Sequence, residues 1–257
     1  ILDRFDYDED DEEWVVVNEI RVERVRRVTA MLETSAHRAG ERIAVVAPAE
    51  LMNAPSSNAL LKTLEEPPPG ATLLLVSDQP GRLLPTVTSR CLRVDAPRPA
   101  DGEAIAWLRE RGVADPAGAL ALAGGAPLAA LALADPAASA EREAWFDALA
   151  RPERLAPIAL GARIEAGGKD GRKARLAQAL DALVAWTADL ARVAAGGAPQ
   201  RLPGRAAAIA ALAPRVARIG LCRYHRSVLF QRAHVAHPLQ PRLVAEGLVA
   251  AYVALFD

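Results

Sequence analysis

The residues with the clearest chemical potential form the triplet Ser89-Arg90-Cys91. An arginine guanidinium is planar and always charged, and it can bind two oxygens of a phosphate or a carboxylate at once. Beside a transferring phosphoryl group, it stabilises the negative charge that develops in the reaction. The triplet lies between a proline-bounded loop and the apolar Leu92. By itself, Arg90 is more simply interpreted as a surface arginine after a strand, so its context must decide.

A second group of cations lies near the start of the chain, where four arginines occur within seven residues: Arg21, Arg24, Arg26 and Arg27. Apolar residues recur there at helical spacing, namely Ile20, Val25, Val28, Met31 and Leu32. Residues 20–37 are therefore predicted to form an amphipathic helix with the arginines around its apolar stripe. Arg24 and Arg27 are candidate phosphate contacts, which would give affinity without sequence readout. The alternative is a solvated basic face, partly neutralised by neighbouring glutamates.

Histidine and cysteine give weaker signals. Cys222, His225, His234 and His237 lie near one another, but their spacing is irregular and carboxylates are lacking, so no metal site is predicted. Cys91 and Cys222 are too few for a disulfide framework or a four-cysteine zinc site. This cysteine usage favours a reducing, cytoplasmic compartment.

The elements around Arg90 are well marked. Residues 57–66 place leucines on one side at helical spacing, with Lys62, Glu65 and Glu66 elsewhere. Three prolines at 67–69 end this helix, because proline donates no N–H and clashes with the preceding turn. The apolar run at 72–76 is predicted to be a strand buried on both faces of a parallel sheet. Arg90 would follow the carboxyl end of that strand, where open α/β sheets carry their sites.

These features, in this order, resemble the clamp-loader branch of the AAA+ proteins. The segments NALLKTLEEPP at residues 58–68 and LLPTVTSRC at residues 83–91 carry the similarity, which is closest to the delta-prime family of bacterial DNA polymerase III. The helix at residues 20–37 and the tail at residues 237–256 are also similar to that family. The resemblance implies that Arg90 reaches into the ATP site of a neighbouring motor subunit, as an arginine finger acting in trans.

The resemblance also suggests supporting roles around Arg90. Ser89 would position the loop through hydrogen bonds, and Cys91 would fill space as a small buried hydrophobe. Lys62, exposed on the preceding helix, is a weak candidate for contact with the neighbouring subunit or with DNA phosphate. A simply solvated lysine is an equally good interpretation.

An active AAA+ motor has three features that this sequence lacks. No G-x-x-x-x-G-K-S/T loop occurs in the 257 residues. Ala47 and Pro48 follow the strand predicted at residues 43–46, where a motor carries an Asp-Glu pair that holds Mg²⁺ and polarises water. Glu50 comes too late to replace it, and Leu128 stands where the lid helix of a motor carries a nucleotide-sensing arginine. The chain is therefore expected to have no ATPase activity of its own.

The predicted fold is α/β followed by all-α. Residues 1–96 would form the C-terminal part of an AAA+ RecA-like domain, residues 97–138 a helical lid, and residues 139–257 a helical collar that holds subunits in a ring. In the family, the phosphate-binding loop and a cysteine-rich zinc module precede the acidic segment, so the sequence is expected to begin partway through its first domain. The expected helices span residues 101–111, 116–123, 140–150, 173–195, 205–219, 221–236 and 241–256, with one more starting near residue 124.

Composition sets broad limits. Hydrophobic residues make up 51% and charged residues 25% of the chain, as in ordinary globular proteins. The net charge of −1 argues neither for nor against nucleic acid as a direct partner. Seven of the eight residues from Asp6 to Glu13 are acidic, which predicts a solvated loop before a short strand at residues 14–17. No apolar run is long enough to span a bilayer.

The resulting hypothesis is a non-hydrolysing subunit of the DNA polymerase III clamp loader. Its expected partners are the gamma/tau motor subunits and the delta subunit, and through them the sliding clamp and primed DNA. ATP and Mg²⁺ would be bound by the motor subunit, and zinc would occur only in a region before Ile1. Two alternatives remain, a gamma/tau-like ATPase truncated at its N-terminus and a purely structural helical adaptor.

Overall fold

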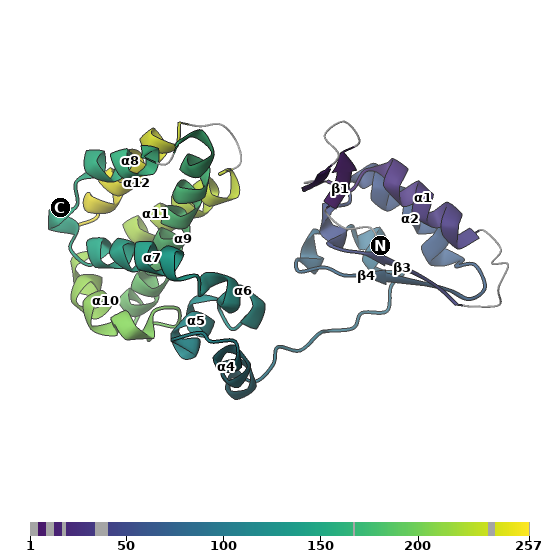
Figure 1. Ribbon diagram of the computed structural model, residues 1–257, viewed down its shortest axis with the longest axis horizontal. Helices are drawn as coiled ribbons and strands as arrows, with labels where there is room; N and C mark the ends of the chain where they lie inside the picture. Colours follow the sequence, from purple (N-terminus) through teal and green to yellow (C-terminus); the bar gives the residue numbers. More distant parts are fainter. Residues whose placement is uncertain are drawn as a thin grey trace. The chain divides into compact units, whose positions relative to one another are not determined.

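Helices dominate the structure, as the alanine- and leucine-rich sequence predicts. The computed structural model describes residues 5–8, 13–16, 19–33, 41–166, 168–235 and 240–256. It divides into two compact units, the sheet unit of residues 1–96 and the helical unit of residues 97–257. Each is described by itself below (Figure 1).

The sheet unit is built around two parallel strands, β3 (Arg42–Val46) and β4 (Ala71–Leu75), with Val46 opposite Leu75. Parallel neighbours need a crossover connection, and α2 (Ala54–Glu65) supplies it. α1 (Val22–Glu33) packs against both α2 and β3, and Figure 1 shows the two helices on one side of the strand pair. The core between them contains Ile20, Val25, Val46, Ala49, Met52 and Leu60.

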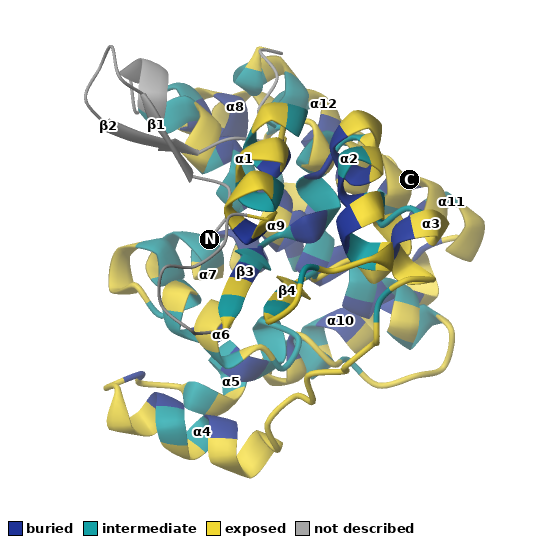
Figure 2. Ribbon diagram, turned by 90° about the vertical axis from the view of Figure 1, so that its right-hand side faces the viewer, coloured by how far each residue is buried: buried dark blue, intermediate teal, exposed yellow. Residues whose placement is uncertain are grey.

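The prediction that β4 is buried on both faces is wrong. Leu73 and Leu75 pack toward the core, whereas Leu74 is 48% exposed and Val76, just beyond the strand, is 52% exposed. On β3, Ile43 is 56% exposed. Figure 2 shows exposed and half-buried residues along both strands. The physical reason is that both packed helices, α1 and α2, contribute to the core on one side of a sheet of only two strands.

Two polar residues fix the start of α2, which begins three residues earlier than predicted. Asn53 caps the helix, and its side-chain oxygen accepts from the Ser56 N–H at 2.8 Å. The buried Ser56 hydroxyl donates to the Ile20 carbonyl at 2.6 Å, which ties the chain just before α1 to α2. On α1, Val25 and Leu32 are buried as predicted, but Met31 is 49% exposed. At 100° per residue, Met31 lies about 100° around the helix from Leu32, outside the buried stripe.

The acidic segment is only partly the loop that was predicted. Phe5–Asp8 forms strand β1, which pairs antiparallel with β2 (Glu13–Val16), with Tyr7 opposite Trp14. The alternation of Phe5 and Tyr7 with aspartates is a strand pattern, and it overrides the charge density. The predicted strand at residues 14–17 is confirmed as far as Val16, and residues 9–12 lie outside the described part of the chain.

The helical unit contains nine α-helices in the part of it that the structure describes: α4 (Asp101–Glu110), α5 (Pro116–Leu122), α6 (Pro127–Leu133), α7 (Pro136–Leu149), α8 (Pro157–Glu165), α9 (Gly168–Ala194), α10 (Ala206–Leu212), α11 (Arg218–Ala233) and α12 (Pro241–Val253). The helix α8 was not predicted. The single helix predicted at residues 205–219 is wrong, because α10 ends at Leu212 and the short helix η5 (Ala213–Arg215) follows. Pro214, which has no N–H to donate, lies at this break.

Buried hydrogen bonds join distant helices of this unit. The Trp186 indole on α9 donates to the Tyr252 hydroxyl on α12 at 2.8 Å, and that hydroxyl donates to the Leu149 carbonyl at the end of α7 at 2.9 Å. All three residues are at most 1% exposed. Burial raises the pKa of Tyr252, so the phenol remains protonated and can donate. These bonds lie within the large core formed by helices α7 to α12.

A smaller core lies under α4, α5 and α6, where Ala104, Leu108, Leu120 and Ala130 are buried together. The Arg142 guanidinium on α7 donates to the Leu133 carbonyl at the end of α6 at 2.9 Å. The three short helices therefore contact the rest of the helical unit. The division predicted at residue 138 stays a prediction.

Candidate functional site

Arg90 lies just after the short helix α3 (Pro85–Thr88). Pro85 occupies the first turn, where its missing N–H costs nothing, and Val87, 1% exposed, anchors the helix in the sheet unit. Ser89 is the C-cap residue, and the backbone N–H of Arg90 donates to the Val87 carbonyl at 3.1 Å. The helical turn thus continues through the triplet and holds the Arg90 backbone in a defined place.

The Arg90 side chain is bound by four hydrogen-bonding contacts within the sheet unit. Its Nε donates to Glu65 Oε1 at 2.5 Å, and its Nη2 lies 2.5 Å from the same oxygen. Its Nη1 donates to the Thr86 carbonyl at 2.9 Å and to the Ser89 hydroxyl at 3.3 Å. The end of α2 and the turn after α3 therefore meet at this guanidinium.

Arg90 and Glu65 both lie at the surface, with side chains 34% and 51% exposed. A charged group from outside the chain can therefore approach them. Cys91 is half-buried rather than fully buried as predicted, and burial raises the pKa of its thiol. A raised pKa favours the protonated thiol, which is a poorer nucleophile than a thiolate.

Comparison with known proteins finds sequence similarity in this region. The family model described as "DNA polymerase III, delta subunit" matches residues 6–99, the segment that contains Glu65 and Arg90. The delta-prime subunit of DNA polymerase III from Pseudomonas aeruginosa is 44% identical over 115 residues, and that of Escherichia coli is 43% identical over 120 residues. Residues 6–99 are therefore similar in sequence to the delta-prime subunits of DNA polymerase III.

The similarity to the delta-prime family has limits of coverage. The aligned part is 43% of this chain and 35% of the Pseudomonas protein, and 45% and 36% for the Escherichia coli protein. The chain thus covers about a third of these relatives. A solved gamma subunit-related protein of DNA polymerase III from Thermotoga maritima is 19% identical, with a TM-score of 0.48 over 93% of this chain and 81% of that one. This value lies below the level that establishes a shared fold.

The residue that sequence reasoning missed in this family-matched region is Glu65. It was placed off the apolar side of its helix and given no role, although it is part of the LEEPP segment that carries the family resemblance. An arginine that packs against the protein surface is stabilised by an anionic or carbonyl partner, and this preference pointed to the nearby acids. It could not choose between Glu65 and Glu66, because that choice depends on how α2 and α3 pack.

The other predicted contacts lie on α1 and α2. Lys62 is exposed on α2, one turn before Glu65. Arg27 is exposed on α1, and Arg24 is half-buried on the same helix. The contacts that surround Arg90 come from Glu65, Thr86 and Ser89. The roles of Lys62, Arg24 and Arg27 as phosphate or subunit contacts stay predictions.

The positions predicted to lack motor chemistry have clear structural settings. Ala47 and Pro48 follow β3 directly, and Glu50 lies in the short helix η1 (Ala49–Leu51). Leu128 is the second residue of α6, and its side chain is 74% exposed. Neither an alanine nor a proline side chain can bind Mg²⁺, and a leucine cannot sense a phosphate charge.

Among the residues that the structure describes, no three or more His, Cys, Asp or Glu side chains are grouped so that they could hold a metal ion. His237 lies outside the described residues. No single described helix has the length and apolar character to cross a membrane, and α5 with α6 passes such a test only as a pair bent by 109°.

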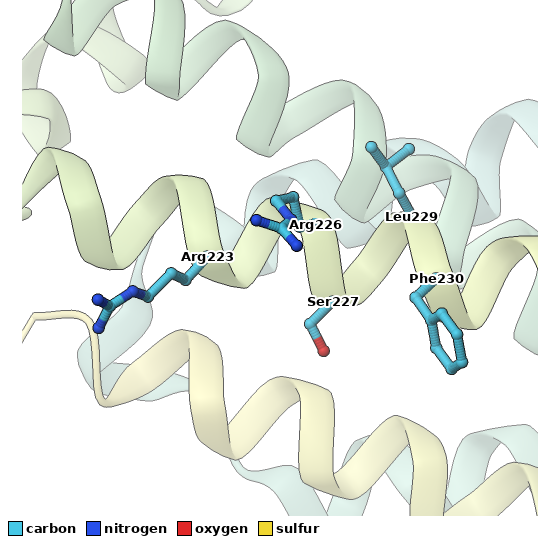
Figure 3. A pocket seen from close by; sticks show the side chains of 5 residues that line it. All are labelled: Arg223, Arg226, Ser227, Leu229 and Phe230. Carbon is cyan, nitrogen blue, oxygen red and sulfur yellow. The ribbon is translucent and has the colours of Figure 1, made fainter.

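An open groove of about 640 Å³ runs along α11. It is lined by Arg223, Arg226, Ser227, Leu229 and Phe230. Figure 3 shows Arg223, Ser227 and Phe230 on one side of the helix and Arg226 and Leu229 on the other. Because all five residues come from one helix and point in two directions, the groove offers no convergent set of groups that could perform chemistry.

Proposed function

We propose that this chain is part of a non-hydrolysing delta-prime subunit of the bacterial DNA polymerase III clamp loader. In this role Arg90 acts in trans, in the ATP site of a neighbouring motor subunit. The observation that carries the proposal is the Ser89-Arg90-Cys91 turn, which lies within the family-matched residues 6–99 and presents a 34% exposed guanidinium from a fixed backbone.

The mechanism uses only the charge and shape of Arg90. A guanidinium beside the terminal phosphate of ATP stabilises the charge that spreads over the phosphoryl oxygens during transfer. Ser89 supports the turn, because its hydroxyl donates to the Thr86 carbonyl at 3.2 Å and accepts from Arg90. ATP and Mg²⁺ belong to the motor subunit, because this chain has Ala47 and Pro48 where a motor has its metal-binding acids.

The domain roles follow from the same proposal. Residues 1–96 serve as the C-terminal part of a RecA-like domain, residues 97–138 as a lid, and residues 139–257 as a collar that holds the subunits together. The partners are the gamma/tau and delta subunits, with the sliding clamp and primed DNA reached through the complex in the cytoplasm.

The test is DNA-stimulated ATP turnover by a reconstituted clamp loader. It compares the complete subunit, its Arg90→Ala variant and an Arg93→Ala control, with assembly checked by gel filtration. Arg93 is a suitable control because it lies three residues after Arg90 in the sequence. Its exposed ion pair with Asp95 does not involve Arg90. Loss of an arginine finger should lower turnover at the site it serves by roughly 10³- to 10⁵-fold, with the complex intact.

The outcomes separate the alternatives. If Arg90→Ala assembles and leaves turnover unchanged, the chain is a structural adaptor and the finger mechanism is wrong. A complete subunit that hydrolyses ATP without the motor subunits would instead favour a gamma/tau-like motor. Equal losses in Arg90→Ala and Arg93→Ala would show that the surface is sensitive to any lost arginine.

A further inference from the structure

We propose that Glu65 is a latch for Arg90. In this structure the carboxylate of Glu65 binds the guanidinium against α2, and we infer that a phosphate of the neighbouring subunit must displace Glu65 before Arg90 can act. The inference rests on the proposed function of Arg90 and assigns a regulatory role to a second residue of the same site.

The hydrogen-bond donors of Arg90 are nearly all in use. A guanidinium has five N–H donors, and its Nε and Nη2 form one edge that binds a carboxylate or a phosphate by two parallel bonds. That edge faces Glu65 Oε1, with both nitrogens 2.5 Å from it. Nη1 is engaged by the Thr86 carbonyl and the Ser89 hydroxyl. A phosphate therefore finds the edge that it would bind already occupied.

Charge acts in the same direction. The Glu65 carboxylate neutralises Arg90 and places a negative charge where the phosphate would approach, so the pair attracts a phosphate less than a lone arginine would. Releasing the carboxylate restores one full positive charge at the tip of the turn. The bonds from Nη1 to the Thr86 carbonyl and Ser89 hydroxyl can remain, so the guanidinium keeps its place while its outer edge changes partner.

The pair is also weak enough to be displaced. The two side chains are 34% and 51% exposed, and ion pairs with such exposure change an equilibrium constant by less than about fivefold. The terminal phosphate of ATP carries more negative charge than one carboxylate and is held by its own subunit at a fixed distance. It can compete with Glu65, whereas a dilute anion in solution gains much less.

The experiment measures KM for ATP and kcat separately in the reconstituted clamp loader that contains the complete subunit. The variants are Glu65→Gln and Glu65→Ala, with Glu66→Gln as the matched control. Glu66 is the adjacent acid, exposed at the end of α2, and it makes no contact with Arg90 among those described. Both Glu65 variants should lower KM for ATP about two- to fivefold without lowering kcat, because Arg90 no longer has a competing partner. Glu66→Gln should behave like the unmodified subunit.

A double variant shows whether Glu65 acts through Arg90. In an Arg90→Ala background, Glu65→Gln should leave KM and kcat unchanged, because Glu65 then has no guanidinium to bind. If Arg90→Ala lowers turnover but the Glu65 variants match the unmodified subunit, the latch is overturned and the finger stands. A fall in kcat for Glu65→Gln also overturns the latch, since Glu65 would then be positioning Arg90. If Arg90→Ala has no effect, the finger and the latch both fail.

Discussion

Each of the two units contains a carboxylate that binds a part of the chain distant in sequence, but one carboxylate is buried and the other lies at the surface. In the helical unit Asp189, 1% exposed, accepts three backbone N–H bonds, from Gln200, Arg201 and Leu202, at 3.0, 2.9 and 2.7 Å. In the sheet unit Glu65 lies at the surface and binds the side chain of Arg90. The first fixes a loop against a core helix, and the second holds a group that can exchange partners.

The difference extends to the cores. Trp145, Trp186 and Tyr252 are at most 1% exposed in the helical unit, and buried hydrogen bonds satisfy the Trp186 indole and the Tyr252 hydroxyl. The sheet unit leaves Ile43 and Leu74 half exposed on one face of its strands. Buried, fully bonded groups contribute stability, whereas exposed charges contribute little stability but remain available to a partner. The comparison predicts where substitutions will affect folding and where they will affect only function.

The largest effect on stability is expected in the helical core. Leu180 is 0% exposed, so Leu180→Ala should reduce the free energy of unfolding by about 2–5 kcal/mol, through lost burial and the cavity that remains. Leu74→Ala, at a 48% exposed position of the sheet unit, should cost less than about 1 kcal/mol. Urea denaturation followed by circular dichroism measures both. Equal losses for the two variants would contradict the contrast between the units.

A smaller loss is expected at the buried carboxylate. Asp189→Asn keeps the size of the side chain, but the amide NH₂ would face backbone N–H groups and cannot accept a hydrogen bond from them. The substitution should therefore reduce the free energy of unfolding by about 2 kcal/mol. The control is Asp181→Asn, because Asp181 is 49% exposed and pairs with Arg232 at the surface. Its cost should be below about 1 kcal/mol. An Asp189 variant as stable as the control would show that the loop needs no charged anchor.

The smallest effect is a pH dependence at His225 on α11. Its Nδ1 lies 2.7 Å from the Thr187 hydroxyl, and burial followed by the charge of Arg201 lowers its pKa below the ordinary 6.5. The unfolded chain therefore binds a proton more readily than the folded one, so stability is highest above about pH 6.5 and falls as pH decreases toward the lowered value. His225→Gln should flatten this part of a urea-midpoint profile. A variant with an unchanged slope would assign the effect to other groups.

Much of the local structure was predictable, because it depends on neighbours in the sequence. The prolines at 67–69 end α2, and Gly112, which adopts a φ of 78°, ends α4. The helix α8 was missed because Pro157–Glu165 has glycine at its centre and few long apolar side chains outside the buried face. The apolar run at residues 72–76 could not predict that one face of β4 is exposed, because the burial of a strand face depends on which elements pack against it.

The sequence by itself indicated the order of most elements and determined the absence of motor residues at Ala47, Pro48 and Leu128. Local spacing, proline and side-chain chemistry are sufficient for these conclusions. The short helix α3 before Arg90 was predicted only as a proline-bounded loop. Only the tertiary structure decided which charges meet. Glu65 and Arg90 lie 25 residues apart, and Asp189 lies 11 to 13 residues from the N–H groups it binds. Such pairs form only when helices pack, because packing brings together groups that no local pattern relates.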